Sequence, residues 1–234
     1  MYEFSAKYYD ALYLSMKDYR KEAARLVEII HQHQPVGGKC LLDVACGTGL
    51  HLAYLIEEYD VQGLDINPEM LAVARERLPG VVLHQADMTD FYLAETYDII
   101  TCLFSSIGYV RTLEKQNQAV ACMAAHLSQG GILIIEPWFT PDAWKPDTVH
   151  ASFIDEPELK IARINTSLQR GNLSYFDLHH LVGTPQGTEY FVEHHELGLF
   201  TQEEMLHAVE LSGLKVSYDS QGLMGRGMYI GKKE

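Results

Sequence analysis

Residues 41–52, LLDVACGTGLHL, form the stretch that decides the fold. An apolar run leads to Asp43, the chain then turns through Gly47 and Gly49, and helix-forming residues follow. Several nucleotide-binding folds share such a strand, glycine turn and helix, because glycine lets the backbone approach a ligand and a helix N-terminus presents free N–H groups. We therefore expect a ligand at this turn.

The sequence around this turn alternates short apolar runs with helical stretches. Strands are predicted at residues 40–45, 61–66, 81–87, 97–105, 130–139, 214–219 and 227–231, and helices at 50–59, 67–78 and 113–127. Runs that are apolar throughout indicate a largely parallel sheet buried by helices on both faces. The pattern predicts a doubly wound α/β fold around a seven-stranded, Rossmann-like sheet.

Three further segments complete this architecture. Apolar residues spaced three and four apart predict N-terminal helices within residues 1–34. After the fifth strand, alternation interrupted by QRGN and TPQGT predicts an antiparallel β insertion over residues 142–199. Asn67 is expected to cap the helix over residues 67–78. Thr201, with Glu204 three residues later, predicts a capping box that starts a helix. We expect residues 1–234 to form a single domain.

Composition excludes several classes of partner. The formal net charge of -14 opposes binding to nucleic acid and to anionic lipid, because both require a basic surface. No apolar run approaches the roughly 18 residues of a membrane span, and the start lacks the features of a secretory leader. We expect a cytoplasmic protein that binds neither nucleic acid nor membrane. Buried free thiols are expected at Cys40, Cys46, Cys102 and Cys122.

The details of the turn narrow the choice of ligand. A P-loop needs a lysine after its last glycine, and none follows Gly49. A dinucleotide fingerprint needs a third glycine where this chain has Leu52. The remaining pattern, D-x-A-C-G-T-G, resembles the first motif of class I S-adenosylmethionine (SAM) methyltransferases, which usually carries glycine in place of Ala45.

Two more strand ends agree with a SAM site. Asp65 ends the second strand, where a carboxylate can accept hydrogen bonds from both ribose hydroxyls. Asp87 and Met88 end the third, where methyltransferases of this class contact adenine, and Leu103 is expected near the adenosine. The resemblance implies cofactor contacts from Tyr19, Asp43, Ala45, Gly47, Gly49, Asp65, Ile66, Asp87, Met88 and Leu103.

A closer resemblance extends over essentially the whole chain. The strings KDY, LLDVACGTG, TCLFSSIG, EPWF, EHHELGLF and GRGMYIG are similar to those of dTDP-amino-sugar N,N-dimethyltransferases of the desosamine and mycaminose type. A pyrophosphate bound to an acidic protein needs arginine donors. The resemblance implies substrate contacts from Tyr13, Trp138, Arg163 and Arg226.

Tyr109 departs from the family pattern, which has histidine after SSIG, near the reacting amine. The tyrosine is compatible with a different sugar, with a different number of methylations, or with a hydroxyl group as the methyl acceptor. Transfer from a sulfonium is an in-line displacement that depends on holding donor and acceptor in place. We therefore expect Tyr109 to position the acceptor without serving as an obligatory base.

The predicted function is SAM-dependent methylation of a small molecule, with the amino group of a dTDP-linked deoxysugar preferred. The alternatives are an O- or N-methyltransferase with an unrelated acceptor and a non-catalytic SAM-binding module. A homodimer through an exposed edge of the inserted sheet is also open. No metal is expected, because neighbouring histidines on a strand point to opposite faces, as at residues 179–180 and 194–195.

Overall fold

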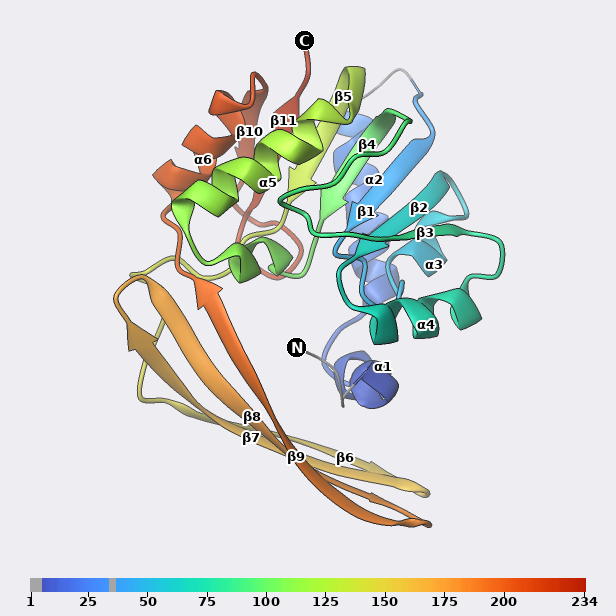
Figure 1. The fold of residues 1–234 in the computed structure, drawn as a ribbon, viewed down its shortest axis with the longest axis vertical. Helices are drawn as coiled ribbons and strands as arrows, with labels where there is room; N and C mark the ends of the chain where they lie inside the picture. Colours follow the sequence, from blue (N-terminus) through green and yellow to red (C-terminus); the bar gives the residue numbers. More distant parts are fainter. Residues whose placement is uncertain (1–5, 34–36) are drawn as a thin grey trace.

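The main sheet of the computed structural model has seven strands in the order β10-β11-β5-β4-β1-β2-β3, and the structure describes residues 6–33 and 37–234. Strands β1 to β5 pair in parallel, whereas β11 pairs antiparallel with both β5 and β10. The predicted doubly wound fold is confirmed (Figure 1). The strands are β1 (Cys40–Val44), β2 (Asp60–Asp65), β3 (Val82–Gln85), β4 (Tyr97–Cys102), β5 (Leu127–Ile135), β10 (Lys215–Asp219) and β11 (Met228–Lys232).

Helices cover both faces of this sheet. One core cluster joins the sheet to α5 (Leu113–Ala125) and α6 (Gln202–Leu211), and a second joins it to α2 (Tyr19–His33), α3 (Leu52–Leu55) and α4 (Pro68–Arg77). Consecutive strand residues serve opposite clusters: Ile99 belongs to the second and Ile100 to the first, and both are fully buried. This two-sided burial explains why the strands read as unbroken apolar runs.

Local capping signals are confirmed. Asn67 accepts hydrogen bonds from the backbone N–H groups of Glu69 and Met70 at 2.8 and 3.0 Å and starts α4. Thr201 and Glu204 form the predicted capping box of α6. These side chains satisfy N–H groups that have no partner inside their helix.

Two local predictions are wrong. The helix expected over residues 50–59 is limited to α3, because the chain must turn at once into β2, which begins at Asp60. Cys40 is exposed, because it opens β1 at the solvent-facing end of the strand, whereas Cys46 and Cys102 are buried and Cys122 is half-buried. All four are free thiols.

The insertion is a separate antiparallel sheet of four strands. Its order is β6 (Val149–Glu156), β7 (Leu159–Arg170), β8 (Leu173–Thr184) and β9 (Gly187–Gly198). The turns predicted from QRGN and TPQGT join β7 to β8 and β8 to β9. Strand β6 was not predicted from sequence, because Ile154 is its only buried residue and the apolar signal is weak.

Helix α1 (Ala6–Leu14) lies between the two sheets (Figure 1). Its residues Tyr8, Leu12 and Tyr13 pack in one cluster with Ile154 and other inner-face side chains of the insertion. The rest of the predicted N-terminal helical segment contains the non-helical residues 15–18 and helix α2. Residues 1–5 and 34 of that prediction lie outside the described residues. Across the described ranges, the helices are too short or too polar to cross a bilayer.

Candidate active site

The turn after β1 is built from left-handed backbone. Ala45, Gly47 and Gly49 have φ values of 61°, 57° and 74°. Such a φ is costly for alanine, which explains why glycine is usual at the position of Ala45. A Cβ added to Gly47 would meet no heavy atom of the described residues within 4 Å, so the space beside this glycine is open. A Cβ on Gly49 would lie 2.8 Å from Leu78 Cδ1, so this glycine allows the turn to pack on α4.

Asp65 connects this turn to the end of β2. One carboxylate oxygen accepts the N–H of Gly47 and the other accepts the N–H of Asn67, each at 2.8 Å. The residue is 8 % exposed, and burial raises the pKa of its carboxyl group although both hydrogen bonds lower it. The carboxylate is therefore fixed in orientation beside the turn.

Two small cavities follow the carboxyl ends of the parallel strands. One, of about 200 Å³, is lined by Ala45, Asp65, Ile66, Asp87 and Met88 among others. The other, of about 40 Å³, is lined by Tyr19, Asp43, Ala45, Gly47 and Leu103 among others. Because Ala45 lines both, we treat them as one strand-end cleft.

All the predicted cofactor residues except Gly49 line the strand-end cleft. Leu103 lines the smaller cavity with Tyr19 and Asp43, whereas Asp87 and Met88 line the larger one. The sequence prediction missed several other lining residues of the smaller cavity, namely Tyr9, Thr48, Leu50 and His51. Tyr9 and His51 carry no motif of their own, and folding brings them to the glycine turn.

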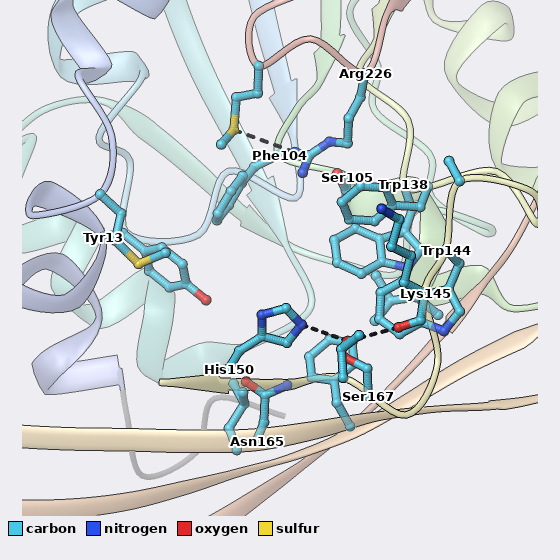
Figure 2. Close-up of a pocket in the computed structure, with 18 of the residues that line it drawn as sticks. Tyr13, Phe104, Ser105, Trp138, Trp144, Lys145, His150, Asn165, Ser167 and Arg226 are labelled. Atoms are coloured by element: carbon cyan, nitrogen blue, oxygen red, sulfur yellow. Dashed lines mark hydrogen bonds between the residues drawn. The ribbon is translucent and has the colours of Figure 1, made fainter. Parts of the chain in front are cut away.

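A third cavity, of about 680 Å³, lies against the insertion sheet (Figure 2). We call it the large cavity. It brings together residues from α1, η1 (Ser106–Val110), the segment after β5, strand β7 and the loop before β11. The predicted substrate residues and the predicted positioning residue all line it: Tyr13, Tyr109, Trp138, Arg163 and Arg226.

Aromatic rings and a carboxylate hold Arg226. Its guanidinium carbon lies 5.7 Å from the ring centre of Trp138 and 5.4 Å from that of Phe139. Its Nη2 atom lies 3.5 Å from Oε1 of Glu136, a residue with no exposed surface. The sequence prediction assigned no role to Glu136, although a single acid at the end of the apolar run before Pro137 was a usable signal.

Arg163 is anchored in a similar way on the inner face of the insertion. Its Nε donates to Ser152 Oγ at 3.1 Å, and its guanidinium carbon lies 5.2 Å from the ring centre of Tyr13. The residue is 9 % exposed. Two arginines from distant parts of the chain therefore line the same cavity in fixed positions.

A strained turn separates the large cavity from the strand-end cleft. Phe104 and Ser105 have φ values of 51° and 63°, which are unfavourable for two consecutive non-glycine residues. Glu136 accepts the N–H of Phe104 at 2.7 Å, and Ser105 Oγ donates to the carbonyl of Pro137 at 2.7 Å. Phe104 and Tyr109 each line both the large cavity and the cleft, so they stand where the two meet.

Comparison with known proteins assigns the family. Residues 41–131 match a family profile described as "Methyltransferase domain". The chain is 38% identical over 235 residues to the dTDP-3-amino-3,4,6-trideoxy-alpha-D-glucopyranose N,N-dimethyltransferase of Streptomyces venezuelae, with 99% of each chain covered. It is 37% identical to the dTDP-3-amino-3,6-dideoxy-alpha-D-glucopyranose N,N-dimethyltransferase of Streptomyces fradiae, over 97% of this chain and 89% of the relative. The chain belongs to the dTDP-amino-sugar N,N-dimethyltransferase family.

Solved structures agree with this assignment to the sugar N,N-dimethyltransferases. DesVI from Streptomyces venezuelae superposes with a TM-score of 0.92 at 38% identity, covering 97% of both chains. A SAM-bound amino pentose methyltransferase from Micromonospora echinaspora has a TM-score of 0.88 at 36% identity, covering 97% of this chain and 96% of that one. The prediction of a class I SAM-dependent methyltransferase is confirmed, and its cofactor is SAM.

The two histidine pairs of the insertion sheet split between its two faces. His180 and His195 are each 1% exposed, whereas His179 and His194 face solvent. Within residues 6–33 and 37–234, no three His, Cys, Asp or Glu side chains are grouped so that they could hold a metal ion. Nε2 of buried His180 lies 3.6 Å from Oε2 of Glu193, and buried His195 stacks on Phe176, so both histidines make contacts within the insertion sheet.

Proposed function

We propose that this methyltransferase transfers a methyl group from SAM to the amino group of a dTDP-linked deoxyamino sugar. One observation carries the proposal: the large cavity meets the strand-end cleft at Phe104 and Tyr109, so donor and acceptor can share a boundary. The acceptor class is supported by the similarity over nearly the full chain to enzymes named for dTDP-amino sugars.

The strand-end cleft fits SAM. The Asp65 carboxylate is held by two backbone N–H groups and keeps lone pairs that can accept the ribose hydroxyls. Asp87 and Met88 supply a polar edge and an apolar face for adenine. The open space beside Gly47 admits the amino acid portion. When bound, SAM supplies an electrophilic methyl group on a positively charged sulfur.

The large cavity suits an anionic sugar nucleotide. In a protein with a net charge of -14, a diphosphate needs cations placed locally, and Arg163 and Arg226 both line this cavity. Trp138 offers a flat apolar surface for a base or sugar face, and Tyr13 closes the side formed by α1. The proposed acceptor contacts are Tyr13, Trp138, Arg163 and Arg226. The insertion sheet is proposed to form one wall of the large cavity.

The chain's contribution to chemistry is chiefly orientation. A neutral amine attacks the methyl carbon with its own lone pair, and water can take the proton afterwards. Holding the two reactants in line can lower the barrier by several kcal/mol. Tyr109 and Phe104 lie at the boundary where this alignment is set. We expect Tyr109→Phe to keep substantial turnover; a loss of about four orders of magnitude with unchanged substrate binding would contradict this mechanism.

A thermal-shift experiment tests the proposal. S-adenosylhomocysteine and dTDP are added separately and together, and a joint increase in the unfolding temperature larger than the sum of the two separate increases supports adjacent, coupled sites. Turnover is then measured by mass spectrometry with a panel of dTDP-amino sugars. No dTDP response and no methylated amino sugar would instead favour a small-molecule O- or N-methyltransferase with an unrelated acceptor.

We also propose a homodimer, formed through the outer face of the insertion sheet and not through the sheet edge considered from the sequence; cross-strand pairing places Phe153, Leu181 and Tyr190 on this face. Phe153 and Tyr190 are 68% and 63% exposed and belong to apolar side chains on this face. Sedimentation equilibrium of wild type and Phe153→Glu tests it, with a monomeric wild type as the contrary result. The single-domain organisation and the cytoplasmic location stay predictions.

A further inference from the structure

A hydrogen bond joins the insertion sheet to the boundary between the two cavities. The hydroxyl of Tyr109, in η1, lies 2.9 Å from Nδ1 of His195, in β9. A Cβ added to Gly108 would lie 3.0 Å from Leu197 Cδ2 and 3.1 Å from Trp138 Cβ, so glycine permits this close approach of η1 to β9. The contact is therefore part of the packing of the two elements.

The surroundings of His195 define its chemical state. The side chain is 1% exposed and stacks on Phe176, with ring centres 5.2 Å apart and planes 8° from parallel. Burial, with a smaller contribution from nearby positive charges, lowers the pKa of His195 to about 3. The imidazole is neutral at neutral pH, so it has one ring nitrogen that donates and one that accepts.

We propose that His195 is a positioning residue. Its Nδ1 accepts a hydrogen bond from the hydroxyl group of Tyr109, so the phenol oxygen offers only lone pairs to the amine of the methyl acceptor. Tyr109 lines both the large cavity and the strand-end cleft, which places this oxygen where methyl transfer is proposed to occur. A hydrogen bond from the acceptor N–H to the phenol oxygen then fixes the direction of the nitrogen lone pair.

This arrangement has a consequence for the extent of methylation and rests on the amine acceptor proposed above. A primary amine and an N-methyl amine each carry an N–H that can donate to Tyr109. The second transfer forms a tertiary ammonium group with one N–H, and once water has taken this proton the neutral N,N-dimethyl amine carries no N–H and loses this contact. The pair thus holds the substrates of two successive transfers and weakens the hold on the dimethylated product.

A double-mutant cycle tests the coupling. The variants are Tyr109→Phe, His195→Phe, their combination, and His195→Asn, whose amide oxygen can replace Nδ1 as an acceptor. kcat and KM are measured for the first and second transfers by mass spectrometry. We expect each Phe variant to lower kcat of the second transfer about two- to tenfold, the range of one neutral hydrogen bond. The double variant should match Tyr109→Phe, and His195→Asn should retain most of the activity.

Several results would overturn the proposal. His195→Phe lowering kcat by the same factor in the Tyr109→Phe background would assign it a purely structural role. If kcat falls as much in His195→Asn as in His195→Phe, a hydrogen-bond acceptor at this position has no role. A further readout needs no sugar: in protein with 15N-labelled histidine, Nδ1 of His195 should appear unprotonated and should shift in Tyr109→Phe. A protonated Nδ1 contradicts the proposal for His195, whatever the acceptor is. Failure of the wild-type protein to methylate any amino sugar would refute the proposed function separately.

Discussion

Asp65→Asn isolates the negative charge at the end of β2, because the side chain keeps its size. Each carboxylate oxygen now accepts one backbone N–H at 2.8 Å, from Gly47 and from Asn67. An amide has one carbonyl oxygen, so one N–H would face an NH₂ group. A hydrogen bond to a charged group contributes about 1.5–3 kcal/mol. Because burial already disfavours the charge and raises the pKa of Asp65, we expect the free energy of unfolding to fall by about 1.5 kcal/mol.

The same substitution should weaken the donor site. Losing one of two acceptors for the ribose hydroxyls should raise Kd for S-adenosylhomocysteine about tenfold, equivalent to about 1.4 kcal/mol. Isothermal titration calorimetry measures Kd, and urea unfolding measures stability. Asp60→Asn is the matched control, since it makes the same change at the exposed start of β2 and should alter neither. A folded Asp65→Asn protein with Kd within about twofold of wild type would refute the reasoning.

Three further predictions concern other parts of the site. Arg226→Met should raise KM for the sugar nucleotide at least about tenfold and leave the affinity for S-adenosylhomocysteine unchanged. It should also reduce the free energy of unfolding by about 3 kcal/mol, because Glu136 loses its cation. Steady-state kinetics and urea unfolding check these results. Ala45→Gly should keep cofactor affinity and gain up to about 1 kcal/mol of stability by relieving the φ of 61°, whereas Ala45→Val should lose both. Burial favours the neutral carboxyl group of Asp43 and raises its pKa to about 6 from an ordinary 3.8. The stability that this neutral group contributes is therefore full below about pH 4 and is lost as pH rises through 6. Asp43→Asn should remove this dependence, about 3 kcal/mol in all, in urea unfolding between pH 4 and 7.

The donor half of the molecule could be predicted because its signals are local. Each buried strand is an apolar run, and the side chains at strand ends follow those runs directly in the sequence. Asp65 and Asp87 were therefore identified by their positions alone, and both line the strand-end cleft. The capping signals at Asn67 and Thr201 are equally local and fixed the starts of α4 and α6.

The acceptor half depends on contacts between distant residues, which periodicity does not reveal. Tyr109 and His195 are 86 residues apart in sequence, and nothing in either segment indicates that they meet. Glu136 acquires its role only when Arg226 reaches it from the C-terminal loop. Strand β6 was missed for a different reason: it is largely exposed, so its sequence lacks the apolar alternation that marked its neighbours.

The insertion gathers one wall of the large cavity into a single stretch of the chain. The residues lining the strand-end cleft lie between Tyr9 and Lys115, whereas strands β6 to β9 form one uninterrupted stretch after β5 (Figure 1). A single recombination event spanning residues 149–198 would exchange one whole wall of the large cavity while leaving the glycine turn and its neighbouring strand ends intact. New acceptor preferences can therefore arise in this architecture by segment exchange, without rebuilding the donor side.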